Sequence, residues 1–280
     1  MKTIMDKFNL AGRVAIVTGG PGLLGKEFCR TLAEAGATVV VADINAQGVN
    51  AVATSLIGAG YHAMGVATDI TQPASVSALV EETLSSYGHL DILVNSAALD
   101  PKFDPQALAK MAKLGTVSGS FEDYPLDSWK DALDVNLTGM FLCCQAAVKP
   151  MLAQGKKGSI INICSTYGLV APDQRIYQRE GKQITYKPVY YSVTKAGVLG
   201  FTRYLSAYYA GTQIRVNALT PGGIYNNHDE VFLKAYSART VMGRMANKDE
   251  MNGALLFLSS DASSYMTGSN LVVDGGWTAW

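Results

Sequence analysis

The sequence predicts an α/β protein: a doubly wound, parallel sheet of seven strands with helices on both of its faces. Short runs rich in β-branched residues alternate with amphipathic stretches along the whole 280-residue chain, which is the pattern of repeated βαβ units. The Val and Ile runs are continuous instead of alternating with polar residues, as in strands buried on both faces. No linker or change of composition divides the chain, so residues 1–280 are expected to form one domain.

The individual elements follow from this alternation. Strands are predicted, in order, at 13–19, 38–44, 62–70, 91–95, 159–164, 214–220 and 270–275. Helical patterns lie between them, for example at 23–35, 73–87, 128–154 and 189–209. Two long connections that contain Pro and Gly, at about 99–125 and 171–188, interrupt the alternation and are interpreted as inserted loops. Structureless loops of this length in a compact domain are usually either functional or disordered.

Composition narrows the classes of function. An apolar content of 48% and a charged content of 16% suit a packed core, and 23 basic residues balance 23 acidic ones. A chain without a basic field is expected to bind neither nucleic acid nor an anionic membrane. The four cysteines form no CxxC motif, and with three scattered histidines they predict no metal site. The first residues lack the apolar core of a signal peptide and no apolar run is long enough to span a membrane, so a cytoplasmic protein is expected.

The first strand and helix carry the densest motif, "VAIVTGGPGLLGKEFC". The predicted strand ends at Thr18, and four glycines fill the turn into the helix: Gly19, Gly20, Gly22 and Gly25. Glycines at such a turn let the backbone approach a pyrophosphate, whose charge is stabilised at the helix N-terminus. Asp43 ends the second strand, where a carboxylate suits the free hydroxyls of an adenosine ribose and repels a 2′-phosphate. The alternative is a tight turn without a ligand; together, these residues favour a Rossmann-like dinucleotide site.

The stretch "VYYSVTKAG" places a tyrosine and a lysine one helical turn apart. Tyr191 and Lys195 share a helix face, whereas Tyr190 points about 100° away. A cation beside a phenol favours the phenolate and lowers a pKa that starts near 10, which would give an acid/base suited to neutral pH. The alternative, an amphipathic helix with a Tyr and a Lys on its flank, is the better interpretation of this motif taken alone.

Taken together, these motifs resemble the single-domain short-chain dehydrogenase/reductase family over nearly the whole chain. The family's glycine loop is matched by "TGGPGLLG" (18–25), its adenine contact by Asp69 in "ATDIT", and its NNAG turn by "NSAA" (95–98). Four later motifs match in order: "NLTG" (136–139), "STYG" (165–168), Tyr191-x-x-x-Lys195 and "PGG" (221–223); "VDGG" (273–276) resembles the closing signature.

The resemblance implies a set of site residues. Tyr191 would exchange the proton of the substrate hydroxyl, Lys195 would hold the nicotinamide ribose and depress the tyrosine pKa, and Ser165 would stabilise the reacting oxygen. Asn136 would hold a water that links Lys195 to solvent. The implied cofactor contacts are Gly19, Gly22, Leu24, Gly25, Asp43, Asp69, Ile70, Asn95, Ala97, Tyr191, Lys195, Pro221, Gly222 and Ile224.

The sequence also departs from the family pattern. The middle glycine of the loop falls at Leu23, with Gly22 one residue early, so a slightly altered turn is expected. Ser96 and Ala98 replace the second asparagine and the glycine of the NNAG turn, and both are small enough to keep the backbone path. Asn226 stands where the family often has a threonine five residues after the proline, and its amide would still be available to the cofactor.

The resemblance and Asp43, without any Arg or Lys in 18–25, favour an NAD-dependent oxidoreductase acting on a secondary alcohol or ketone. A polyhydroxylated sugar or sugar acid is the expected substrate, because the expected loops hold many hydrogen-bonding groups: Asn226, Asn227, His228, Asp229, Tyr167, Gln174 and Tyr177. A carboxylate or phosphate would suit Arg175, Arg179, Lys182 and Lys187, unless these form a solvated loop face. The chain also resembles sugar-acid dehydrogenases and oxidoreductases of surface-sugar or flagellar-glycan biosynthesis.

Two other functions remain open. Ser165 and Tyr191 are 26 residues apart, about twice the usual gap in the family, and this resembles the dehydratases and epimerases that retain NAD. A non-catalytic NAD sensor or scaffold is the third possibility.

The long gap between Ser165 and Tyr191 is filled by 171–188, which is expected to be a lid over the substrate. A homotetramer or homodimer is implied through 128–154 and 189–209, and the tail "GGWTAW" adds two tryptophans that suit an interface.

Overall fold

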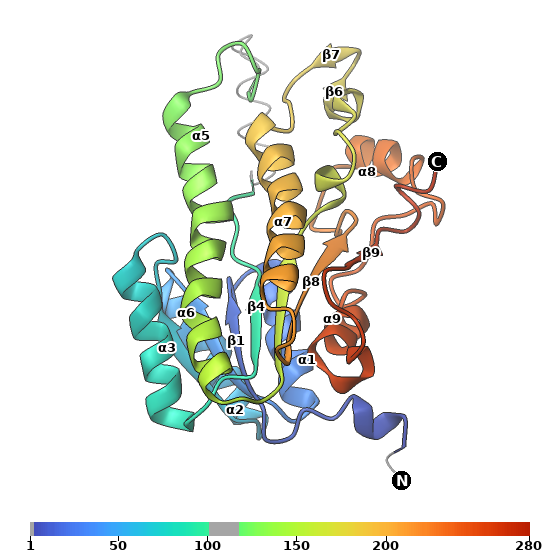
Figure 1. Ribbon diagram of the computed structural model, residues 1–280. Helices are drawn as coiled ribbons and strands as arrows, with labels where there is room; N and C mark the ends of the chain where they lie inside the picture. Colours follow the sequence, from blue (N-terminus) through green and yellow to red (C-terminus); the bar gives the residue numbers. More distant parts are fainter. Residues whose placement is uncertain (1–2, 101–117) are drawn as a thin grey trace.

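The computed structural model describes residues 3–100 and 118–280 and confirms the predicted fold class. Seven parallel strands form one sheet in the order β3-β2-β1-β4-β5-β8-β9, with helices on both faces (Figure 1). The strands are β1 (Val14–Thr18), β2 (Thr38–Asp43), β3 (Ala63–Ala67), β4 (Ile92–Asn95), β5 (Gly158–Ile163), β8 (Ile214–Pro221) and β9 (Asn270–Val273). All seven predicted strands are therefore present, although β3 is shorter than expected.

The α-helices of the described residues include those predicted from the sequence and several more. They are α1 (Leu23–Glu34), α2 (Ala46–Gly58), α3 (Pro73–Tyr87), α5 (Leu126–Leu133), α6 (Met140–Ala153), α7 (Val189–Tyr208), α8 (Glu230–Ser237) and α9 (Asn252–Ser259). The helix expected at 128–154 is interrupted by a π-helical turn, η2 (Asp134–Gly139), between α5 and α6. In the part of the chain that the structure describes, no helix is long and apolar enough to cross a membrane.

Two apolar layers enclose the sheet, one on each face. Successive residues of β1 point to opposite layers: Ile16 packs towards α3, α6 and α7, and Val17 packs towards α1, α2 and α9. Both side chains are fully buried, and each such burial stabilises the fold by about 1.5–3 kcal/mol. The two-sided burial explains why the strands are continuous Val/Ile runs in the sequence.

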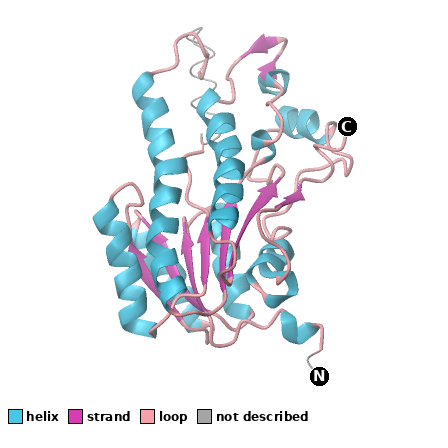
Figure 2. Ribbon diagram, in the orientation of Figure 1, coloured by secondary structure: helices cyan, strands magenta, loops and turns pink. Residues whose placement is uncertain are grey.

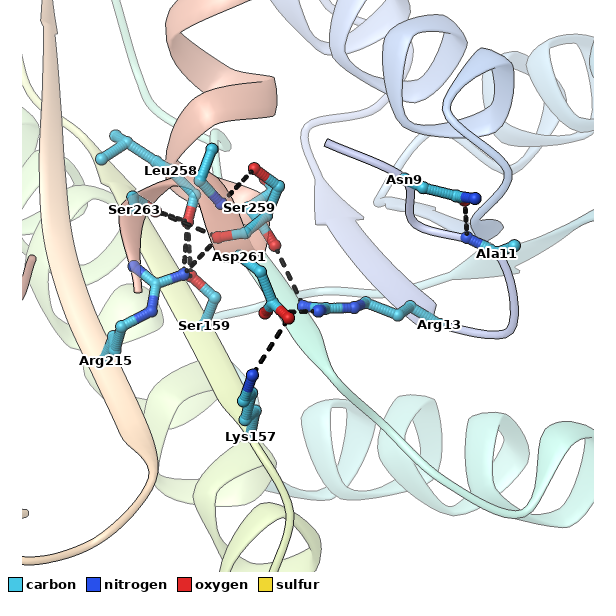
Figure 3. A network of polar contacts seen from close by, with 12 residues as sticks. Asn9, Ala11, Arg13, Lys157, Ser159, Arg215, Leu258, Ser259, Asp261 and Ser263 are labelled. Atoms are coloured by element: carbon cyan, nitrogen blue, oxygen red, sulfur yellow. Dashed lines mark hydrogen bonds and ion pairs between the residues drawn. The ribbon is translucent and has the colours of Figure 1, made fainter. Parts of the chain in front are cut away.

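Polar contacts hold the amino ends of β5 and β8 to the C-terminal part of the chain (Figure 3). Arg215 at the start of β8 donates hydrogen bonds to the carbonyls of Leu258 and Ser260, at 2.9 and 3.1 Å, and to Ser159 Oγ at 3.2 Å. Burial lowers the pKa of Arg215 to about 10, which leaves it charged at neutral pH. This network lies at the opposite end of the strands from the candidate site described below.

The insertion at 171–188 is folded. It contains a 3-10 turn, η4 (Gln174–Tyr177), and a short antiparallel hairpin formed by β6 (Gln178–Arg179) and β7 (Lys182–Gln183). The Tyr177 ring lies 5.5 Å from the Phe232 ring of α8, and Arg179 forms an ion pair with Asp229 at 2.5 Å. Figure 2 shows this hairpin as the small pair of strands far from the N-terminus. Most of the insertion expected at 99–125 lies outside the described residues.

Candidate functional site

The candidate site lies at the carboxyl ends of the strands, at the point between β1 and β4 where the strand order reverses. β1 and β4 are neighbours, but β1 leads into a helix on one face and β4 leads to helices on the other. In open α/β sheets, a topological switch of this kind marks the crevice in which ligands bind, at the carboxyl ends of the strands. The glycine loop after β1 and the "NSAA" turn after β4 border it.

Close packing makes the glycines of this loop necessary. Gly19 has a φ of +70°, and a Cβ there would lie 2.8 Å from the backbone of Ala97. A Cβ on Gly25 would lie 2.0 Å from the carbonyl oxygen of Gly19. Thr18 Oγ1 accepts hydrogen bonds from the amides of Ser96 and Ala97, both at 3.2 Å, so the loop and the turn form one packed unit. Only glycine leaves the backbone this accessible at both positions.

The start of α1 suits an anionic group. The helix begins at Leu23 after Gly22, which has an extended backbone, and no side chain caps its first amides. The first turn contains no acidic residue, so the positive end of the helix is not neutralised by the chain itself. The altered glycine spacing is accommodated because the Gly22 amide donates to the Gly19 carbonyl at 2.9 Å. A dinucleotide pyrophosphate fits this cradle of glycines and amides.

The residues expected at the adenosine end lie on adjacent strand ends. Asp43 closes β2 and is partly exposed, and its Oδ1 accepts a hydrogen bond from the Asn45 amide at 2.9 Å. Asp69 follows β3 and accepts from the amide and hydroxyl of Thr71, at 2.9 and 2.7 Å. Ile70 is buried beside Gly139, where a Cβ would lie 2.7 Å from the Ile70 side chain. These contacts fix the two carboxylates at the edge of the crevice.

Asn95 ends β4 inside the molecule. Its Nδ2 donates to Asn162 Oδ1 at 2.9 Å and to Cys144 Sγ at 3.2 Å, and Asn162 in turn donates to Thr202 Oγ1 at 3.0 Å. Asn95 Oδ1 is buried and accepts no hydrogen bond from the described residues. A buried acceptor of this kind is stabilised when a bound group donates to it, as a ligand in the crevice would do.

The Ser–Tyr–Lys residues meet at the junction of β5 and α7. Ser165 follows β5 and its hydroxyl accepts a hydrogen bond from the Tyr167 amide at 3.2 Å. Tyr191 and Lys195 lie on one face of α7, and Lys195 Nζ is 5.7 Å from the centroid of the Tyr191 ring. Lys195 is buried and donates to the Ile163 carbonyl at 2.9 Å. Tyr190 is buried on another side of the helix, with its ring 6.0 Å from that of Tyr124.

The pKa of Tyr191 differs from the expectation. Burial raises it well above its usual value, the Asp100 carboxylate raises it further, and a hydrogen bond from Ser165 offsets part of the increase. Burial also lowers the pKa of Lys195. Burial, and not Lys195, dominates the pKa of Tyr191, and the Lys195 ammonium donates to the Ile163 carbonyl. These surroundings therefore favour the protonated form of Tyr191.

Asn136 sits in the π-helical turn between α5 and α6. Its Oδ1 accepts from the Leu99 amide at 2.7 Å, while its Nδ2 donates to the Leu99 carbonyl at 3.1 Å and to Thr194 Oγ1 at 3.2 Å. The side chain thus connects the segment after β4 with α7. π-helical turns often occur at functional sites, and this one turns Asn136 into the interior.

The loop after β8 closes the site on its other side. Gly222 pairs with Val273 through its amide, at 2.9 Å, and a Cβ on Gly222 would lie 2.7 Å from Asp274. The next residue, Gly223, donates to the Tyr236 hydroxyl at 2.5 Å. Tyr236 stacks on Trp277, with the ring centroids 4.3 Å apart. Pro221 ends β8, and Ile224 forms a single bridge to Ala246, so the expected cofactor residues of this loop are held by the C-terminal segment.

Sequence analysis named Lys187 as one of four loop cations suited to an anion but did not place it beside Tyr191. Lys187 Nζ lies 3.9 Å from the centroid of the Tyr191 ring, closer than Lys195 does, and forms an ion pair with Asp100 at 2.5 Å. The signal was available, since Lys187 and Tyr191 are also four residues apart. Pro188 caps α7, so Lys187 lies just outside the helix that carries Tyr191.

The other loop residues expected at the substrate are used within the chain. Arg175 pairs with Asp173 and Arg179 pairs with Asp229, while the Asp229 side chain also caps α8. Gln174 forms hydrogen bonds with the backbone of Lys187. Tyr167 and Tyr177 belong to an apolar cluster beside Tyr191, whose other buried members are Ile176, Phe232, Tyr236, Met245 and Trp277. The wall next to Tyr191 is therefore more aromatic than the sequence suggested.

The chain is similar to known dehydrogenases over almost its full length. A family model described as enoyl-(acyl carrier protein) reductase matches residues 23–278. The cis-4-hydroxycyclohexanecarboxylate dehydrogenase of Sinomonas cyclohexanicum is 36% identical over 96% of this chain and 98% of its own length. The D-threitol dehydrogenase of Mycolicibacterium smegmatis is 34% identical over 97% of this chain and 95% of its own length.

A solved structure shows the same architecture. The gluconate 5-dehydrogenase of Burkholderia cenocepacia, in complex with NADP and tartrate, superposes with a TM-score of 0.85 at 31% identity. The similarity covers 99% of this chain and 100% of that chain. The matches in sequence and structure agree with the motifs at the crevice, and the chain belongs to the short-chain dehydrogenase/reductase family of oxidoreductases.

Proposed function

We propose that this enzyme transfers a hydride between NAD and a secondary alcohol or ketone, and that the reacting group meets Tyr191. The arrangement of Ser165, Tyr191 and Lys195 at the junction of β5 and α7 is the observation that carries the proposal. The bound nicotinamide would supply the hydride donor or acceptor, which no side chain can replace. The glycine loop, Asn95 and the loop after β8 are the groups that would hold it.

The chain's own residues would handle the proton. Tyr191 is proposed to give or take the proton of the substrate oxygen, and Ser165 to donate a hydrogen bond to that oxygen as negative charge develops. Lys195 would orient the cofactor ribose. Asn136 would support a water between Lys195 and solvent; its contacts to Leu99 and Thr194 hold it on the α7 side of the site, where this role requires it.

Asp43 supports NAD as the preferred cofactor. Its carboxylate lies at the end of β2, where it would accept hydrogen bonds from ribose hydroxyls and repel a 2′-phosphate. The related gluconate 5-dehydrogenase was solved with NADP, so family membership alone does not decide the preference.

A cytoplasmic location is proposed because all four cysteines are buried and unpaired, as expected in a reducing compartment.

A polyhydroxylated compound such as a sugar or sugar acid is the proposed substrate. The relatives named above act on a cyclic hydroxycarboxylate, on D-threitol and on gluconate, so polyols and hydroxy acids are both represented. The dehydratase or epimerase that retains NAD is the second candidate, and the 26-residue separation of Ser165 and Tyr191 is the observation in its favour. The non-catalytic sensor has no observation in its favour, since Asn136, Ser165, Tyr191 and Lys195 are all present.

A screen of polyols, sugar acids and cyclic hydroxy acids with NAD and NADP tests the proposal. Net formation of NADH, read by its absorbance, is expected with at least one alcohol. A product formed without net NADH would instead support the dehydratase or epimerase, and cofactor binding without turnover would support the sensor.

Replacing Tyr191 with Phe should lower kcat by about 10²–10⁴-fold, because the variant loses the proton donor and keeps the packing. Cofactor affinity should change by only a few-fold, as measured by fluorescence titration with NADH. Tyr190→Phe is the matched control, since its ring packs on Tyr124 and not towards Ser165. Equal losses in the two variants would contradict the assignment of the helix face.

Replacing Asp43 with Ala should lower the ratio of kcat/KM for NAD to that for NADP by about 10–100-fold, since the variant loses both the ribose contact and the repulsion. Steady-state kinetics with both cofactors measure the ratio. Glu82→Ala, which removes an exposed carboxylate from α3, should leave the ratio unchanged. A wild-type enzyme that already prefers NADP would overturn the role proposed for Asp43.

A homodimer or homotetramer is proposed through α5, α6 and α7. Large apolar side chains are exposed on these helices: Leu126, Phe141, Leu152, Val193, Tyr204 and Tyr208. Such exposed groups at neighbouring helices are typical of an interface between protein chains. The argument from the tail changes, because Trp277 is buried in its own chain and only Trp280, which is 78% exposed, remains available to a partner.

Light scattering should therefore give a mass of at least two 29.8-kDa chains at micromolar concentration. Tyr204→Glu should shift the mass towards one chain, because the charge would be buried at the interface. Tyr265→Glu is the control, since Tyr265 is fully exposed and lies outside these helices. A wild-type mass of one chain would contradict the proposed assembly.

A further inference from the structure

We propose that Lys187 binds the carboxylate of the substrate, so that the enzyme selects hydroxy acids over neutral alcohols. The inference rests on the proposed function and names its substrate class. One side chain, Lys187, is proposed to pair with the negative charge of the substrate. It lies in the 171–188 insertion, between Ser165 and Tyr191.

Position is the first argument. The Lys187 ammonium lies 3.9 Å from the centroid of the Tyr191 ring and 6.0 Å from that of Tyr167. A substrate whose hydroxyl meets Tyr191 would therefore have this cation within reach of its remaining groups. The side chain of Lys187 is only 13% exposed, so the charge is shielded from water and acts more strongly than a surface lysine would.

Lys187 is also held in place. The side-chain amide of Gln174 accepts from the Lys187 amide at 2.9 Å and donates to the Lys187 carbonyl at 3.1 Å. Gln183 Nε2 donates to the carbonyls of Gln174 and Thr185, at 2.9 and 2.6 Å, so the second strand of the hairpin holds the turn that contains Gln174. Pro188 then leads directly into α7. A lysine that is oriented by its backbone loses less freedom when it binds a ligand.

The present partner of Lys187 indicates which ligand it binds. Asp100 supplies one carboxylate at 2.5 Å, and its side chain is 54% exposed, against 13% for Lys187. Removing that carboxylate without a replacement would leave a shielded cation unpaired, which is unfavourable. A substrate carboxylate can take its place, because Asp100 is exposed enough to be hydrated after it is displaced. One ammonium paired with one carboxylate matches a monoanionic ligand.

The other cations of the insertion do not compete for this role. Arg175 and Arg179 are paired with Asp173 and Asp229, respectively. Lys182 is exposed on the hairpin. Next to Tyr191, the buried rings of Tyr167, Tyr236 and Trp277 form an aromatic wall. Besides Lys195, which is proposed to hold the cofactor ribose, the site therefore combines the fixed cation of Lys187 with aromatic surface, which suits a hydroxy acid with a compact carbon skeleton.

The experiment uses two unreactive probes of one shape, cyclohexanecarboxylate and cyclohexanecarboxamide, titrated calorimetrically into the full chain saturated with NADH. The wild type should bind the carboxylate at least about 10-fold more tightly than the amide. Lys187→Met should weaken binding of the carboxylate by about 10-fold or more and change binding of the amide by less than about 3-fold. Lys182→Met, an exposed lysine of the same insertion, is the matched control.

Two further variants separate binding from stability. Lys187→Arg should retain the preference for the carboxylate, because it retains the charge. Asp100→Asn should tighten binding of the carboxylate by a few-fold and leave the amide unchanged, since the competing carboxylate is removed. A purely structural ion pair would instead lower the thermal midpoint in Asp100→Asn without tightening either probe, and that result would overturn the inference.

The outcomes also distinguish this inference from the proposed function. Equal affinities for the two probes in the wild type, or equal losses for both in Lys187→Met, would overturn the role of Lys187 even if alcohols are oxidised. Because the probes are unreactive, their binding can be measured even if no alcohol yields NADH. The absence of turnover would then count against the proposed function alone.

Discussion

The close approach of the turn after β5 to the backbone of α7 is the constraint on which the proposed catalytic geometry depends. A Cβ on Gly168 would lie 2.6 Å from the Lys195 carbonyl, so only glycine permits this contact. The same carbonyl accepts a hydrogen bond from Cys164 Sγ at 3.2 Å, and the Lys195 ammonium donates to the Ile163 carbonyl at 2.9 Å. The strand end and the helix are therefore joined in both directions, which sets Ser165 against Tyr191.

This junction explains why a long insertion between Ser165 and Tyr191 is tolerated. The two ends of the insertion are held by β5 and α7, so its length does not change the position of the reacting groups. The loop-closure free energy rises only slowly with length, and the insertion recovers part of it through its own hairpin and its ion pair with α8. Extra sequence at this position can alter what faces Tyr191 without altering Tyr191 itself.

The parts that sequence predicted are those whose physics is local or periodic. Two-sided burial produces the Val/Ile runs, and the tight turn that follows β1 requires glycine. Both the strands and the glycine loop could therefore be predicted from the sequence. The π-helical turn at Asn136 could not be predicted from the sequence, because the position of Asn136 depends on contacts with Leu99 and Thr194 from distant parts of the chain. Burial of Trp277 depends in the same way on Tyr236.

The raised pKa of Tyr191 also depends on contacts between distant parts of the chain. A shared helix face predicts an effect of Lys195 on Tyr191, but it does not predict how deeply Tyr191 is buried. In the fold, loss of water outweighs any nearby cation and keeps the phenol neutral. Lys187 and Lys195 nevertheless lie at 3.9 and 5.7 Å from the same ring, so two cations adjoin the phenol that, in its proposed role, must be deprotonated before it accepts the proton of an alcohol. The Asp100 carboxylate opposes that deprotonation. A substrate carboxylate that takes its place at Lys187 would carry the same charge, so the pair with Lys187 would stay balanced while the substrate is bound.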